Sequence, residues 1–163
     1  MKTLLLLRHA KSSWDDPSLA DFDRPLNGRG KRDAPRMGRL LREQGLEPDR
    51  VLCSTAKRAR KTAYKVLQAS GFAVDMNEDD RLYHAAPQAF VEVLQQQGDP
   101  LNCVLVVAHN PGLEEFLALL TGQYDRMPTA ALAQIDLAID RWSELSHDTR
   151  GTLHALWRPK ELD

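Results

Sequence analysis

Polar residues follow three short apolar segments of the chain. Residues 4–7, 51–53 and 104–108 are apolar throughout, and they run directly into Arg8-His9, Ser54-Thr55 and His109-Asn110. Short runs of this kind are typical of strands buried on both faces in a parallel sheet. Ligands of such sheets bind at the edge where the carboxyl ends of the strands meet. We therefore expect the three polar pairs to lie together at one site.

The residues gathered at this edge are suited to a dianion. Arg58 lies in the first turn of the helix expected after Ser54, so it can point to the same edge. The strand ends contribute no carboxylate, and the set comprises Arg8, His9, Arg58 and His109. Arginine forks match phosphate oxygens with paired, charge-assisted hydrogen bonds. The N-termini of two following helices would direct backbone N–H groups to the same place. The pattern therefore predicts a phosphate site.

A histidine among arginines offers nucleophilic catalysis. The neutral imidazole of His9 can attack phosphorus and form a phosphohistidine intermediate. The two arginines and His109 would stabilise negative charge on the phosphoryl oxygens, and water would then displace the phosphoryl group. No metal or other cofactor is required, because side chains supply the positive charge. A metal site built from His9 and His109 is the alternative, but the arginines would oppose a bound cation.

Each of these residues also has an ordinary structural interpretation. Arg58 belongs to a basic run, residues 57–61, that is typical of a solvated helix face. His109 could be a polar cap, and Arg8-His9 could be an exposed strand end. The convergence of three strand ends favours the functional interpretation of the whole set.

Composition indicates an ordinary soluble protein. The chain has 163 residues, of which 42% are hydrophobic and 28% charged, so we expect one domain over residues 1–163. The net charge of −1 provides no general attraction to nucleic acid or to an anionic membrane. Apolar runs are too short for a membrane span or a signal peptide, so we expect a cytoplasmic protein. The oligomeric state stays open.

Strands and helices are expected to alternate. Strands are predicted over residues 3–8, 51–53, 73–76 and 104–108, and two further strands without an intervening helix over residues 131–139 and 152–157. This order predicts a three-layer α/β/α sandwich with a mostly parallel central sheet and antiparallel strands near its edge. The two cysteines, Cys53 and Cys103, have no C-x-x-C spacing and are predicted to be small buried hydrophobes.

The helix boundaries are less uniform. The first helix ends at Gly45 and begins near either Asn27 or Asp33, because Pro35 suits a first turn but kinks a helix interior. Glycines and a proline mark other boundaries: Gly71 and Gly122 as ends, Pro87 as a start. Two side-chain caps are also predicted, from Ser54-Thr55 and from Asn110 followed by Pro111.

Several motifs together resemble the histidine phosphatase superfamily, which has the phosphoglycerate mutase-like fold. Leu7-Arg8-His9-Ala10 resembles its R-H-G/A signature, residues 54–62 its S-x-x-x-R-x-x-x-T segment, and residues 107–111 its second histidine segment. The short length resembles the SixA-type phosphohistidine phosphatases, as do residues 23–27, 109–112 and 127–131. The resemblance implies His9 as the nucleophile, with Arg8, Arg58 and His109 holding phosphate, and no cofactor.

One position departs from the superfamily pattern. Many members carry a glutamate proton donor in an R-L-x-E segment, where this chain has His84. An alkoxide leaving group needs such an acid, whereas an imidazole is a far weaker base and can leave without one. His84 is either a substitute acid or a surface residue, and three loop aspartates are weaker donor candidates: Asp15, Asp21 and Asp23.

The substrate expected from these features is phosphohistidine in a protein. No long insertion separates the motifs, and an open site suits a phosphorylated protein domain. Trp14 and the arginines of residues 24–42 could frame a docking surface, although Trp14 could equally belong to the core. The alternatives are a small-molecule phosphomonoesterase, a mutase, or a non-catalytic phosphate-binding module. A pure binding module would not need the nucleophile.

Overall fold

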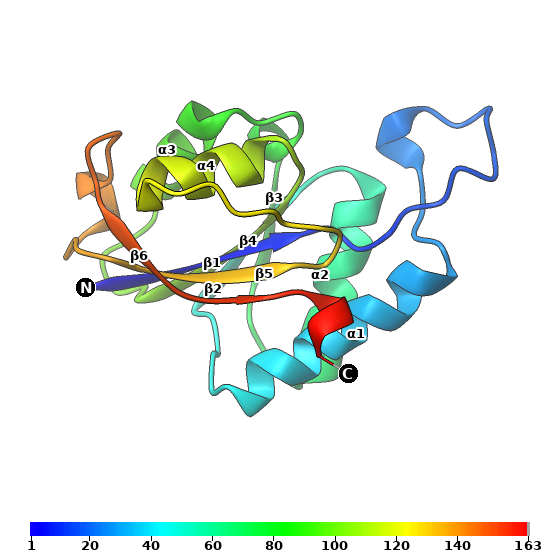
Figure 1. Cartoon of the computed structure of the whole chain (residues 1–163), viewed down its shortest axis with the longest axis horizontal. Helices are drawn as coiled ribbons and strands as arrows, with labels where there is room; N and C mark the ends of the chain where they lie inside the picture. The colour runs from blue at the N-terminus through cyan, green and yellow to red at the C-terminus, as the bar shows by residue number, and fades with distance from the viewer. Residues whose placement is uncertain (163) are drawn as a thin grey trace.

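The computed structural model describes residues 1–162, and its centre is a six-stranded sheet (Figure 1). The strand order is β3-β2-β4-β1-β5-β6. The strands are β1 (Lys2–Arg8), β2 (Arg50–Ser54), β3 (Met76–Asp79), β4 (Cys103–Ala108), β5 (Leu132–Leu137) and β6 (Gly151–Trp157). Strands β1 to β4 are mutually parallel, whereas β5 runs antiparallel to β1 and β6 antiparallel to β5. The predicted parallel sheet with antiparallel strands toward one edge is confirmed.

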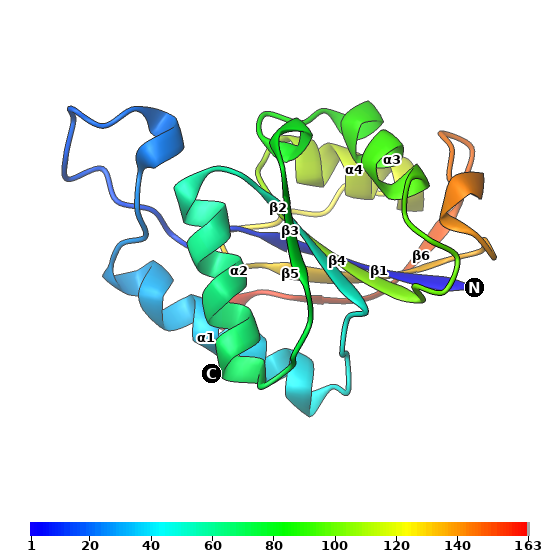
Figure 2. The same ribbon diagram turned by 180° about the vertical axis from the view of Figure 1, so that it is seen from behind.

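Four α-helices cover the sheet in two layers. Helices α1 (Gly28–Glu43) and α2 (Lys57–Ser70) pack together on one face, and α3 (Pro87–Gln95) and α4 (Gly112–Thr121) on the other (Figures 1 and 2). Short 3-10 helices are η1 (Asp21–Asp23), η2 (Asp80–Leu82), η3 (Trp142–Glu144) and η4 (Pro159–Glu161). The predicted three-layer α/β/α sandwich is therefore correct. Within residues 1–162, no helix is long and apolar enough to cross a membrane.

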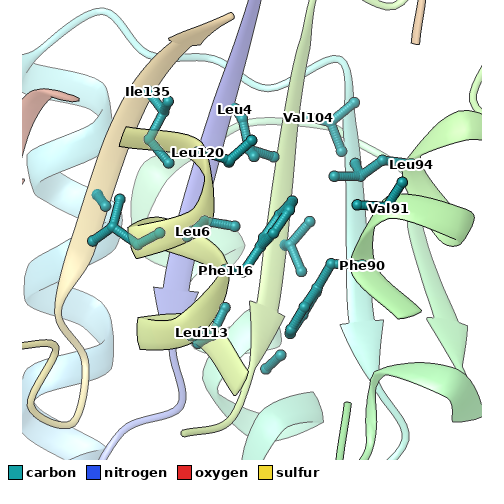
Figure 3. Packing of buried hydrophobic residues seen from close by; sticks show 14 of the residues in the cluster. Leu4, Leu6, Phe90, Val91, Leu94, Val104, Leu113, Phe116, Leu120 and Ile135 are labelled. Carbon is teal, nitrogen blue, oxygen red and sulfur yellow. The ribbon is translucent and has the colours of Figure 1, made fainter. Parts of the chain in front are cut away.

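The central strands are apolar on both faces because both faces are covered. Leu4 and Leu6 of β1 pack under α3 and α4, together with the stacked rings of Phe90 and Phe116 (Figure 3). Leu5 and Leu7 point the opposite way, into the layer of α1 and α2. Successive side chains of a strand alternate between faces, and burying one leucine fully contributes roughly 1.5–3 kcal/mol. This burial fixes where β1 ends and therefore where His9 lies.

The first helix begins at the earlier of its two predicted starts. Asn27 is the N-cap of α1, and its Oδ1 accepts a hydrogen bond from the Gly30 backbone N–H at 2.9 Å. Pro35 consequently lies inside the helix. Gly30 is required for close approach, because a Cβ atom there would lie 2.1 Å from the carbonyl oxygen of Lys11. The start of α1 thus holds the segment that follows His9.

Both predicted side-chain caps are wrong. The N-caps of α2 and α4 are Ala56 and Pro111, and neither makes a side-chain cap bond. The Ser54 hydroxyl and the Asn110 amide are instead engaged elsewhere, with His109 and with the Met127 carbonyl. Polar side chains at a strand end can serve tertiary partners rather than the next helix, and the local sequence does not distinguish the two.

The third strand lies further along the chain than predicted. Residues 73–75 are outside it, and β3 covers Met76–Asp79. The register against β2 pairs Val51 with Met76, which sets the start of the ladder. Because β3 is an edge strand, the polar residues of this segment can remain exposed. Of the two cysteines, both free thiols, Cys53 is buried as predicted and Cys103 is partly exposed.

Candidate active site

The carboxyl ends of β1 and β4 bring two histidines together. Arg8 pairs with Ala108 across these parallel strands, and the His9 N–H donates to the Ala108 carbonyl at 3.1 Å. The next residues along the chain, His9 and His109, therefore face each other, with ring centroids 5.1 Å apart. Strand β2 lies on the other side of β4 and ends level with it, at Ser54.

A cavity of about 300 Å³ opens at this edge of the sheet. All four predicted site residues line it: Arg8, His9, Arg58 and His109. Asn110 also lines it, but the Thr55 hydroxyl points away and donates to Asp80 at 2.7 Å. The expected meeting of two arginines and two histidines at one place is therefore observed.

The side chain of His9 is held in one tautomer. Its Nδ1 donates to the carbonyl of Ala10 at 2.8 Å, which leaves the lone pair on Nε2. The pKa of His9 is lowered to about 3, mainly by burial and also by the neighbouring His109, Arg58 and Arg8, against a smaller opposing effect of the Ala10 hydrogen bond. The imidazole is therefore neutral at neutral pH, the form that a nucleophile requires.

Thr62 connects this histidine to helix α2. Its hydroxyl donates to the Arg58 carbonyl at 2.7 Å and accepts from the Ala10 N–H at 2.9 Å. Thr62 ends the S-x-x-x-R-x-x-x-T segment of residues 54–62, and this motif alone predicts no contact for it. Its position four residues after Arg58 on a helix was the available signal, because such residues share one face.

The second histidine is neutral as well. Its Nε2 lies 2.7 Å from the Ser54 hydroxyl, and its Nδ1 is buried without a hydrogen-bond partner among residues 1–162. Burial lowers the pKa of His109 to about 3, with a further contribution from the charge of Arg58. A buried nitrogen without a partner is costly unless a hydrogen-bond partner reaches it.

Arg8 lies between the cavity and the segment that precedes β5. Its Nη1 donates to the Met127 carbonyl at 3.2 Å, whereas its Nε is buried without a partner within residues 1–162. Burial lowers the pKa of Arg8, and the nearby carboxylate of Glu114 partly offsets this effect. A buried and incompletely paired guanidinium is suited to binding an anion.

Arg58 is oriented by the carboxylate of Asp21, a residue that lies in η1 and not at the end of a strand. Its Nη1 donates to the Asp21 carbonyl at 2.7 Å, and its Nη2 to Asp21 Oδ2 at 2.9 Å. Arg24 and the Tyr83 hydroxyl also donate to this carboxylate, at 3.1 and 2.6 Å. The sequence suggests Asp21 only as a proton donor. The charge pair of Asp21 and Arg24, three residues apart in a polar loop, was the available signal.

The surroundings of Asp21 keep it ionised. Desolvation alone would raise the pKa of this carboxyl group, but the hydrogen bonds from Tyr83, Arg58 and Arg24 together lower it well below its usual range. A carboxylate in this state has no proton to donate near neutral pH. Asp21 therefore fits the role of orienting Arg58 better than that of an acid.

The other acid candidates lie outside the cavity. His84 is exposed, and its ring stacks on Tyr83 with centroids 3.9 Å apart. Asp15 and Asp23 are also exposed, and neither lines the cavity. Among residues 1–162, no group of three or more histidine, cysteine, aspartate or glutamate side chains is arranged to hold a metal ion.

Trp14 stands at the rim of the cavity and not in the core. Its side chain is 72% exposed, and the guanidinium carbon of Arg24 lies 3.2 Å from its ring centroid. Arg24 is itself buried and donates to Ser13 and Ser12 of the same loop. The core alternative for Trp14 is therefore wrong, and an aromatic surface flanks the phosphate-sized cavity.

Known proteins share this fold over nearly the whole chain. A structure of the protein histidine phosphatase SixA complexed with tungstate superposes with a TM-score of 0.85 at 25% identity, covering 99% of each chain. A structure assigned as phosphohistidine phosphatase SixA from Agrobacterium tumefaciens gives a TM-score of 0.82 at 30% identity, covering 97% of this chain and 99% of that one.

Sequence similarity points the same way. An uncharacterised protein of Mycobacterium tuberculosis is 37% identical over 150 residues, covering 85% of this chain and 91% of that protein. A sequence profile for the histidine phosphatase superfamily (branch 1) matches residues 4–86, a segment that includes Arg8, His9 and Arg58. The chain belongs to the histidine phosphatase superfamily.

Proposed function

We propose that this protein is a metal-independent phosphatase that removes phosphate from phosphohistidine in a protein, through a phosphohistidine intermediate on His9. The supporting observation is a cavity lined by a neutral imidazole and two arginines, while among residues 1–162 none of the four acid candidates, Asp15, Asp21, Asp23 and His84, lines it. The solved SixA structures described above support the same substrate class.

The first chemical step is attack by His9. The lone pair on Nε2 forms a bond to phosphorus while the bond from phosphorus to the substrate nitrogen breaks. That nitrogen keeps the electron pair, and the substrate ring leaves as neutral imidazole because its other nitrogen already carries a proton. Arg8, Arg58 and the free Nδ1–H of His109 stabilise the charge on the equatorial oxygens. The Ala10 carbonyl stabilises the His9 ring as it becomes positively charged, because the ring donates to it.

The second step regenerates the enzyme. Water attacks the phosphorus of phosphorylated His9, the bond between phosphorus and Nε2 breaks, and the electron pair returns to the ring. The proton lost by water goes to the released phosphate or to solvent. Both steps use only groups of the chain and water.

The leaving group determines the substrate class. Asp21 is ionised, and His84 is exposed with its ring against Tyr83, so neither is placed as a strong acid over the cavity. An imidazole can leave without such an acid, whereas an alkoxide loses about 10²–10⁴-fold in rate. A phosphoramidate therefore fits this site better than a sugar phosphate.

The test is a substrate ranking on purified protein. We expect kcat/KM to be highest for a histidine-phosphorylated protein, intermediate for p-nitrophenyl phosphate, and lowest for sugar phosphates. Sugar phosphates equal to or better than phosphohistidine would instead indicate a small-molecule phosphatase. Binding of phosphate without turnover of any substrate would indicate a binding module.

Two variants separate the acid candidates. His84→Ala should leave phosphohistidine hydrolysis within about twofold of wild type, because the side chain is exposed. Asp21→Asn should lower kcat/KM for all substrates alike, because it weakens the orientation of Arg58. A selective loss of alkyl phosphate hydrolysis in either variant would identify that residue as a general acid and contradict the proposal.

A further inference from the structure

Two cavities meet at Arg8 and Thr129. One is the phosphate-sized cavity that contains His9, and the other, of about 670 Å³, lies on the opposite side of these two residues. The second cavity is the larger of the two and contains neither histidine. A phosphoryl group held by Arg8 would therefore lie beside a second, unassigned space.

The walls of the second cavity are braced by hydrogen bonds. Glu114 at the start of α4 accepts from the Met127 N–H at 2.7 Å and from the Tyr124 hydroxyl at 3.1 Å. On the other side, Arg158 donates to the Arg126 carbonyl at 3.1 Å. These hydrogen bonds connect the segment before β5 to α4 and to the chain near η4. The walls of the cavity are therefore held in place by the fold.

Two exposed cations of this cavity are unpaired. The side chains of Arg126 and Lys160 are exposed and make no hydrogen bond or ion pair within residues 1–162. The carboxylates of Glu114 and Glu161 are already engaged, the latter with Arg158 at 3.2 Å. The cavity therefore offers two unpaired cations next to the site of the phosphoryl group.

Asp125 adds a different feature. Its Oδ2 is buried without a hydrogen-bond partner in the described chain, at the wall of the same cavity. An unpaired buried carboxylate oxygen is costly unless a donor reaches it. A backbone N–H of a protein substrate could donate a hydrogen bond to this oxygen. An acidic side chain of the same substrate segment could then contact the two cations.

We infer that this second cavity is a subsite for the protein substrate, and that it selects an acidic residue close to the phosphorylated histidine through Arg126 and Lys160. This inference rests on the proposed function, because it assigns the part of the substrate beyond the phosphoryl group. Like the phosphoryl group itself, the selected side chain is an anion, so the two sites together favour a phosphohistidine in an acidic stretch of chain.

A peptide series tests the subsite. Histidine-phosphorylated peptides that differ only in carrying Glu, Gln or Lys near the phosphohistidine are compared by kcat/KM. In the wild type we expect the order Glu, Gln, Lys, with about three- to tenfold between the extremes for contacts with exposed cations. The double variant Arg126→Glu/Lys160→Glu should reverse this order, while its activity on p-nitrophenyl phosphate stays near wild type.

The matched control changes the net charge equally at a distant place. Arg141 and Arg150 are exposed near the end of β5 and the start of β6. The end of β5 pairs with the beginning of β1, away from the carboxyl end of that strand. Arg141→Glu/Arg150→Glu should keep the wild-type order of peptides. The same reversal in this control would show that the net charge of the protein sets the peptide order, and the proposed subsite would be wrong.

A second series separates this inference from the proposed function. The same Glu, Gln and Lys peptides carrying phosphotyrosine present an aryl phosphate to the same two cavities. If wild type hydrolyses no phosphohistidine peptide but still ranks these peptides by charge, the proposed function fails and the subsite stands. If neither series shows a charge preference that depends on Arg126 and Lys160, the subsite is wrong.

Discussion

The Ser54 hydroxyl lies 2.7 Å from Nε2 of His109, and this contact determines which nitrogen of the ring carries the proton. Ser54 Oγ also accepts from the Ala56 N–H at 3.3 Å, and within residues 1–162 its own proton has no acceptor other than His109 Nε2, so we infer that it donates there. Nε2 of His109 is then the acceptor, and the proton resides on Nδ1, the buried nitrogen without a protein partner. In the proposed mechanism, the residue predicted to cap a helix thus prepares a hydrogen-bond donor for the phosphoryl group.

Replacing Ser54 should impair catalysis without removing any group that contacts the substrate. Loss of the hydroxyl lets His109 adopt either neutral tautomer, and we expect Ser54→Ala to lower kcat by about five- to tenfold, the effect of roughly 1 kcal/mol. Nitrogen-15 NMR of His109 should report a protonated Nδ1 in the wild type and a mixture in the variant.

Ser70→Ala is the matched control for this prediction. Ser70 is also fully buried, and its hydroxyl donates to the Leu67 carbonyl at 2.8 Å, at the far end of α2. It should lose stability but not kcat. A wild-type kcat in Ser54→Ala, or an unchanged nitrogen spectrum, would refute the role given to Ser54.

His9→Ala should abolish turnover in a folded protein. The side chain is proposed to carry the phosphoryl group on Nε2, and deleting it removes the bond that must form. Wild type quenched during turnover should show a phosphorylated peptide containing His9 by mass spectrometry under alkaline conditions, and the variant should show none. His147→Ala, at an exposed histidine, is the control. Turnover by folded His9→Ala would exclude the covalent mechanism.

The sequence predicts the central strands and the meeting of four side chains at one cavity, because apolar runs and strand order are enough to place them. An apolar run marks a buried strand, and a parallel sheet brings strand ends together, so His9 and His109 could be placed before the fold was known. Asp21 could not, because its position depends on the path of a long loop that has no periodic pattern. The caps at Ser54 and Asn110 failed for a related reason, since Asn110 bonds to a residue 17 positions away.

Activity should persist after metals are removed. Arg8 and Arg58 supply positive charge at the cavity. A metal cation placed between His9 and His109 would be repelled by both arginines. We expect dialysis against EDTA to leave kcat/KM for p-nitrophenyl phosphate unchanged. Loss of activity that is restored by Zn²⁺ or Mg²⁺ would reassign the two histidines as metal ligands.

Acid should destabilise the protein through the same two histidines. Their pKa is about 3 in the folded protein, against about 6.5 in an unfolded chain. Between these values the unfolded state binds protons that the folded state does not, so the free energy of unfolding falls as the pH is lowered from 6.5 to 3. Each histidine can contribute at most about 1.4 kcal/mol per pH unit in this window. The depressed pKa of Asp21 adds a loss of stability only at lower pH, once that carboxylate is protonated.

Urea unfolding at several pH values measures this effect. The double variant His9→Gln/His109→Gln replaces both titrating rings with neutral amides, so its free energy of unfolding should depend less steeply on pH between 6 and 4 than that of the wild type. The carboxylates titrate in both proteins and cancel in the comparison. Equal slopes would show that the two imidazoles are not held neutral by burial, and the nucleophilic form of His9 at neutral pH would then need another cause.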